Sequence, residues 1–128
     1  DPAPLATAVE NERRIATTVP VSWVRGDATR EPLCPGDGVT VLMNPPFGAQ
    51  GGNEHADRAF LDTTARLADV SYSVHNADSE DFVTAFAGDN GGTVTHAYEA
   101  EFDLPRSFEF HEDERRRIDV EVFRIDWS

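Results

Sequence analysis

Four consecutive residues, Asn44-Pro45-Pro46-Phe47, have the types needed to hold a nitrogen atom during methyl transfer. Such a nitrogen must release its lone pair from conjugation, and two acceptors placed against its N–H bonds draw it towards tetrahedral geometry. The side-chain oxygen of Asn44 is one acceptor, and the carbonyl of Pro45 is the other, because consecutive prolines fix the peptide and leave that carbonyl free. Phe47 offers a face for stacking, worth ~1–3 kcal/mol for a nucleobase. The tetrapeptide predicts a catalytic motif for N-methylation, and a rigid turn is the alternative.

The segments before this tetrapeptide predict how it is positioned. The apolar run 39–43 predicts a strand that ends at Asn44, and ligands of open α/β sheets bind at the carboxyl ends of the strands. A second short strand is predicted over Val21–Val24. It leads to Asp27 and Ala28, which we expect at the same rim, where the Asp27 carboxylate could accept from the amino group of an adenine cofactor. A turn or helix-cap aspartate is the alternative.

The remaining periodicity predicts a mixed α/β protein. Apolar residues recur at helical spacing over 3–17, 57–67 and 78–87, and they alternate with polar residues, as in strands, over 70–74, 93–102 and 118–127. The last two strands are expected to form an antiparallel pair. The sequence therefore predicts one domain over residues 1–128, of class α/β, with a mixed sheet.

Composition narrows the class of protein. No apolar run reaches membrane-spanning length and no leader precedes the first residue, so we expect a soluble, cytoplasmic protein without membrane contact. The single cysteine, Cys34, excludes an internal disulfide, and no metal site is predicted.

The charge is strongly acidic. The chain has 24 acidic and 11 basic residues, all of them Arg, and a net charge of -13. This composition is typical of a halophile's protein, because the Debye length at molar salt is only ~3 Å and self-repulsion is screened. Nucleic-acid binders are normally basic. At molar salt, however, phosphate attraction contributes little to any complex, so the charge does not exclude a nucleic-acid substrate.

Several segments in a fixed order give the chain a family resemblance. They are residues 1–5, 44–48, 57–61, 72–75, 103–111 and 118–124. Together they resemble the class I S-adenosylmethionine-dependent methyltransferases, and most specifically the archaeal form of the small methyltransferase-like family that makes N6-methyladenosine in small-subunit ribosomal RNA. The resemblance covers essentially the whole chain.

The resemblance implies a fold, a reaction and partners. The fold would be a Rossmann-like methyltransferase sheet, and S-adenosylmethionine would be the cofactor, contacted by Asp27, Ala28 and Asn44. The reaction would transfer a methyl group to N6 of an adenine in RNA, with ribosomal RNA as the expected substrate. A small zinc-binding activator subunit would pair with an edge strand around Val21–Val24.

The chain also departs from the family. The family's first strand, its Gly-rich cofactor loop and most of its second strand have no counterpart in the sequence. We therefore expect a partial sheet, the C-terminal portion of an extreme halophile's enzyme, which is inactive and binds S-adenosylmethionine poorly by itself. The sheet edge left exposed predicts self-association.

Further residues are candidates for binding the substrate. His75 ends a strand at the rim of Asn44, although a structural histidine is an alternative. Phe108, Phe110 and His111 lie in an aromatic-rich segment that could border a base pocket or pack on the closing strand pair.

Two other functions compete with RNA methylation. A glutamine-N5 protein methyltransferase could hold a side-chain amide with the same motif, but such enzymes usually have Tyr in place of Phe47 and an extra N-terminal helical domain. A non-catalytic interaction module that retains the fold is the second alternative.

Overall fold

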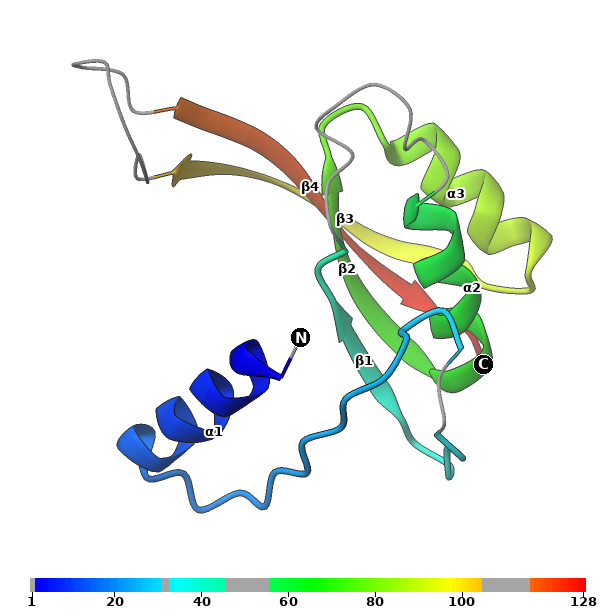
Figure 1. The fold of residues 1–128 in the computed structure, drawn as a ribbon. Coiled ribbons are helices and arrows are strands. Elements are labelled where there is room, and N and C mark those ends of the chain that lie inside the picture. The colour runs from blue at the N-terminus through cyan, green and yellow to red at the C-terminus, as the bar shows by residue number, and fades with distance from the viewer. Residues whose placement is uncertain (1, 31–32, 46–55, 105–115) are drawn as a thin grey trace. The chain divides into compact units, whose positions relative to one another are not determined.

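The computed structural model describes residues 2–30, 33–45, 56–104 and 116–128 (Figure 1). Contacts divide the chain into two compact units, residues 1–32 and 33–128, which are described separately. This division does not test the expectation of a single domain, which stays a prediction.

The first unit contains one helix, α1 (Ala3–Ile15), as the spacing predicts. Pro2 occupies the N-cap position, where a proline ring is tolerated because the first amides of a helix have no partner within it. The helix ends two residues earlier than expected, because Ala16 takes a left-handed conformation with φ 50°. The amide of Ala16 donates to the carbonyl of Glu12 at 3.1 Å, which closes the last turn.

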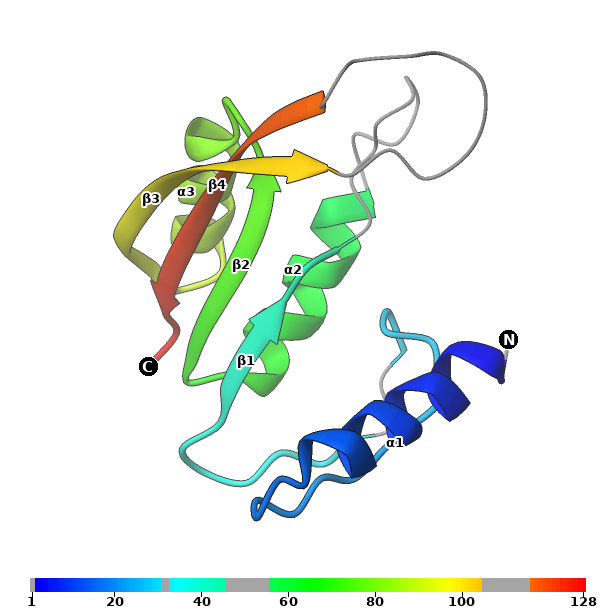
Figure 2. The same ribbon diagram turned by 90° about the vertical axis from the view of Figure 1, so that its left-hand side faces the viewer.

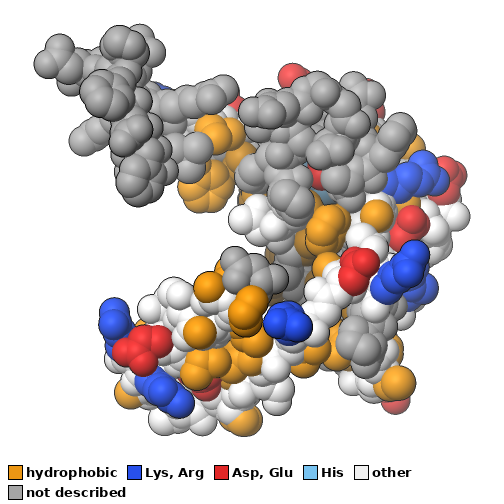
Figure 3. All heavy atoms as spheres, viewed as in Figure 1, with side chains coloured by type: hydrophobic (Ala, Val, Ile, Leu, Met, Phe, Trp, Pro, Cys, Tyr) orange, Lys and Arg blue, Asp and Glu red, His pale blue; other side chains and the backbone are white. Residues whose placement is uncertain are grey.

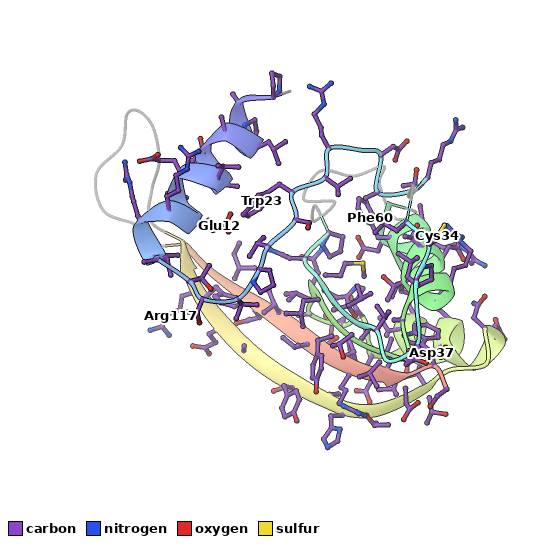
Figure 4. All side chains as sticks on the ribbon, turned by 90° about the horizontal axis from the view of Figure 1, so that it is seen from below. Glu12, Trp23, Cys34, Asp37, Phe60 and Arg117 are labelled. Atoms are coloured by element: carbon purple, nitrogen blue, oxygen red, sulfur yellow. The ribbon has the colours of Figure 1, made fainter. Side chains whose placement is uncertain are left out.

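The predicted strand over Val21–Val24 is wrong. None of these residues enters a strand, although all of them are described. A strand is stable only when a neighbour completes its backbone hydrogen bonds, and the described part of this unit offers no other strand. The indole N–H of Trp23 instead donates to the carboxylate of Glu12, and the two side chains point toward one another in Figure 4. A side-chain bond to α1 therefore ties this segment to the helix.

The second unit is built on a four-stranded mixed sheet in the order β1-β2-β4-β3 (Figure 2). The strands are β1 (Thr40–Met43), β2 (Val70–Asn76), β3 (Thr93–Leu104) and β4 (Arg116–Asp126). Strands β1 and β2 run parallel, and the pairs β2–β4 and β3–β4 are antiparallel. This arrangement confirms the predicted α/β class with a mixed sheet and a closing antiparallel pair.

The two helices in the described part of this unit, α2 (Ala56–Leu67) and α3 (Glu80–Asp89), pack on one face of the sheet (Figures 1 and 2). Among the described residues, the hydrophobic cluster between these layers consists of Leu61, Val83, Phe86, Ala87, Phe123 and Ile125. Strand β2 turns Ser71, Ser73 and His75 towards this side, and all three are fully buried. Polar groups buried in this way must find hydrogen-bond partners.

The carboxyl end of the chain closes the core beside α3. The indole N–H of Trp127 donates to the hydroxyl of Ser71 at 2.8 Å. Gly92, at the start of β3, lies directly against the Trp127 ring, where a Cβ atom would come within 2.6 Å of a ring carbon. Only glycine fits at this approach.

Glu121 of β4 caps helix α3. Ser79 is the N-cap residue, but its hydroxyl donates to the carbonyl of Asn76 at 2.6 Å. The carboxylate of Glu121 accepts the amides of Ser79, at 2.8 Å, and Asp78, at 3.3 Å. A negative group at this end also complements the helix dipole.

The charged surface is mixed in sign over the helices. Acidic and arginine side chains alternate on the visible side of α2 and α3 (Figure 3). Arg58 of α2 extends over the ring of Phe86 with its guanidinium 5.5 Å from the ring centre, a cation–π contact. Among the described residues, no helix is both long enough and apolar enough to cross a membrane.

Candidate active site

Asn44 lies at the carboxyl end of β1, immediately beyond the last residue paired with β2. The ladder ends at Met43, opposite Ser73. Asn44 is exposed and Pro45 is buried. The strand is anchored to α2, since the hydroxyl of Thr64 approaches the sulfur of Met43 at 3.4 Å. The structure thus presents the Asn44 amide to solvent at the rim where ligands of α/β sheets bind.

His75, at the carboxyl end of the neighbouring strand β2, is fully buried and bonded through both ring nitrogens. Its Nδ1 lies 3.3 Å from Oδ2 of Asp57, in the first turn of α2, and its Nε2 lies 2.9 Å from Oγ of Ser73. An ionised carboxylate can only accept, so Nδ1 holds the proton and Nε2 accepts from the Ser73 hydroxyl. The ring also packs against Phe123, with centroids 5.7 Å apart.

Burial lowers the pKa of His75 below its ordinary value of 6.5. Desolvation penalises the imidazolium and is the largest effect. The hydrogen bond to Asp57 and the negative charges of Asp57 and Glu121 favour protonation, but together they do not offset desolvation. The ring is therefore neutral at neutral pH, in agreement with the tautomer that the two hydrogen bonds require.

This pKa shift predicts a loss of stability on mild acidification. Below pH ~6.5 the unfolded chain binds a proton that folded His75 takes up less readily, so the free energy of unfolding decreases as the pH falls. The decrease is at most ~1.4 kcal/mol per pH unit for one proton. It stops once the pH is below the pKa of His75 in the folded protein. Urea unfolding at fixed salt between pH ~7.5 and ~5.5 measures it. The slope should be smaller in His75→Leu, and an equal slope in both proteins would contradict this origin.

The predicted cofactor residues Asp27 and Ala28 belong to the first unit. Oδ1 of Asp27 accepts from the amide of Thr29 at 2.9 Å and from its hydroxyl at 2.7 Å, and these bonds lower the pKa of Asp27. Asp27 is exposed and ionised, within a turn closed by Arg30 N–H donating to the Asp27 carbonyl. The structure thus finds the turn role that the sequence also allowed, and the cofactor contacts of Asp27 and Ala28 stay predictions.

The remaining predicted residues divide into two groups. Asn44 and His75 lie at the carboxyl ends of adjacent parallel strands, as expected. Pro46, Phe47, Phe108, Phe110 and His111 lie outside the described residues, so their roles stay predictions, as does a contact of His75 with substrate.

Sequence reasoning missed Asp57 and Ser73 as partners of His75. A signal for Ser73 was present, because residues two apart on a strand point to the same face and both residues belong to β2. Asp57 opens the predicted helix, but its contact with a histidine 18 residues further along depends on how α2 packs on the sheet.

Comparisons with known proteins relate the chain to RNA methyltransferases. It is 46% identical over 86 residues to an uncharacterized protein of Methanocaldococcus jannaschii, covering 67% of this chain and 38% of that protein. It is 34% identical over 84 residues to the rRNA N(6)-adenosine-methyltransferase METTL5 of Danio rerio, covering 65% of this chain and 39% of the relative. No family model matches.

A solved structure matches nearly the whole chain. It is a crystal structure of a protein from Pyrococcus horikoshii described as a candidate RNA methyltransferase, with a TM-score of 0.75 and 33% identity. The match covers 98% of this chain and 59% of the other. The described sheet therefore has a methyltransferase fold. The chain spans about two fifths of the length of the curated relatives that it matches.

Proposed function

We propose that the full-length protein transfers a methyl group from S-adenosylmethionine to the exocyclic N6 of an adenine in RNA, with ribosomal RNA as the substrate. The observation behind this proposal is the position of Asn44, exposed directly beyond the paired end of β1. The activity named for the Danio rerio relative supports the choice of substrate.

Asn44 and Pro45 would orient the target nitrogen. The Asn44 amide oxygen accepts from one N–H of the adenine amino group, and the carbonyl of Pro45 accepts from the other, which turns the lone pair toward the methyl carbon. Pro46 fixes the peptide and Phe47 stacks on the base, which must be flipped out of any helix. Bound S-adenosylmethionine would supply an electrophilic methyl group on sulfur, and the target nitrogen would lose one proton to solvent.

The chain's residues fit one part of the proposed cofactor. The ionised carboxylate of Asp27 suits the adenine amino group of S-adenosylmethionine, and the turn around Ala28 and the amide of Asn44 offer further polar contacts.

The assay that tests this function is direct. Full-length protein, methyl-labelled S-adenosylmethionine and ribosomal RNA are incubated at molar salt, and the RNA is digested and its nucleosides are separated by mass spectrometry. We expect label in N6-methyladenosine. Label in glutamine of added protein, with none in RNA, would contradict the proposal and favour the amide methyltransferase. Absence of any transfer would favour a non-catalytic module.

The acidic composition suggests the salt conditions in which the protein works, and the first unit suggests where a partner could bind. We propose an intracellular halophilic protein, since the net charge of -13 with arginine as the sole basic residue suits concentrated salt. A zinc-binding activator subunit is also proposed, at segment 21–24, where Val21, Trp23 and Val24 are 44%, 43% and 56% exposed. Because this segment forms no strand, the proposed contact is through these exposed side chains and not through the pairing of strands.

A further inference from the structure

Strand β2 contacts residues that precede and residues that follow the proposed catalytic motif in the sequence. On one side, Met43, the residue before Asn44, pairs with Ser73. On the other side, Asp57 in the first turn of α2 binds Nδ1 of His75. Ser73 and His75 are themselves joined by a hydrogen bond of 2.9 Å. A continuous row of contacts, Met43–Ser73–His75–Asp57, thus connects β1 to the start of α2.

The side chains that form the hydrogen bonds of this row are largely buried. The side chain of His75 is 0% exposed and that of Asp57 only 19%. Oδ1 of Asp57 is buried and has no hydrogen-bond partner among the described residues. The bond between Oδ2 and His75 therefore holds the carboxylate in place. Removing the imidazole would leave buried groups of Ser73 and Asp57 unpaired, which is unfavourable for both.

We infer that His75 is a positioning residue for methyl transfer, which acts through Ser73 and Asp57 to hold the end of β1 and therefore Asn44. The inference rests on the proposed function of Asn44, and it assigns His75 a role without contact to the substrate. A displacement of ~1 Å in an active site can reduce the rate by ~100-fold. The acceptor geometry at Asn44 should therefore depend on the row, whereas affinity for RNA should not.

The test compares two substitutions of His75 in the full-length protein. His75→Leu removes both ring nitrogens, whereas His75→Asn keeps an N–H near the position of Nδ1 and can still donate to Asp57. We expect kcat, per folded enzyme, to fall ~10- to 100-fold in His75→Leu, with KM for RNA changed less than ~3-fold. His75→Asn should recover part of kcat. His96→Leu, which changes an exposed histidine of β3, is the matched control and should retain wild-type kcat.

Two kinetic results would overturn the inference. The first is wild-type kcat in folded His75→Leu, and the second is a raised KM for RNA at unchanged kcat, which would indicate a contact with the substrate. If His75→Leu does not fold, Asp57→Asn replaces it. That variant keeps the shape of the side chain but weakens the bond to His75, so it should lower kcat in the same way, and unchanged kcat would again contradict the inference.

A spectroscopic measurement separates this inference from the proposed function. The side-chain amide resonance of Asn44, identified by its loss in Asn44→Ala, should shift in His75→Leu and not in His96→Leu. This holds whatever reaction the protein performs. A protein that methylates no adenine yet shows the shift would refute the proposed function and support the row. An Asn44 resonance that is unmoved in both variants would refute the row.

Discussion

Replacement of Asn44 by Ala is expected to lower kcat for methyl transfer at least ~100-fold, the usual effect of removing one preorganised polar group from a transition state. The substitution removes the side-chain acceptor that holds one N–H of the target. Because Asn44 is exposed at the end of β1, its removal leaves no cavity, and the fold should persist. Single-turnover kinetics with labelled cofactor and RNA, alongside the affinity for S-adenosylmethionine, measure the effect.

Two further variants make the result specific. Asn44→Asp keeps an acceptor oxygen in place, so it should retain more activity than Asn44→Ala. Asn11→Ala changes an exposed asparagine of α1 and should behave as wild type. Full activity in Asn44→Ala would remove the amide from the mechanism, and with it the main support for the proposed reaction.

Phe123→Ala should reduce the free energy of unfolding by ~3–5 kcal/mol. The ring is 0% exposed in the middle of β4, belongs to the core cluster shared with α2 and α3, and packs against His75. Its removal leaves a cavity that the surrounding strands can fill only in part. Urea unfolding at fixed salt, followed by circular dichroism, measures the change.

The control for this prediction is another phenylalanine of the same sheet. Phe102 of β3 is 50% exposed, so Phe102→Ala should cost less than ~1 kcal/mol, as surface substitutions usually do. Equal effects of the two substitutions would show that the core is not organised around Phe123.

Local pattern predicted the elements that have strong periodicity. The helix beginning near Asp57 and the closing strand pair, β3 and β4, follow from spacing and alternation within the segments themselves. The strand over Val21–Val24 failed because its apolar residues satisfy local propensity, whereas a strand also requires a partner along its edge. Propensity is local and pairing is not.

The contacts of the site were predictable only in part. The exposure of Asn44 beyond β1 follows from the apolar run that ends at Met43. The bond from Asp57 to His75 depends instead on the distance between a helix and a strand. The capping of α3 by Glu121 joins residues 42 apart in sequence. Such contacts depend on register and packing angle, which a single sequence does not specify.

The unequal lengths of the strands have a consequence for motion. Strand β1 is four residues long and pairs on one side within the described sheet, whereas β3 and β4 are twelve and eleven residues long and pair with each other almost throughout. Local opening requires less free energy where fewer backbone bonds must break together. The amides of β1 should thus exchange with solvent through small, frequent openings, and those of the β3–β4 pair through rarer and larger ones. The proposed catalytic asparagine therefore follows directly after the strand of the sheet that can open and close most readily.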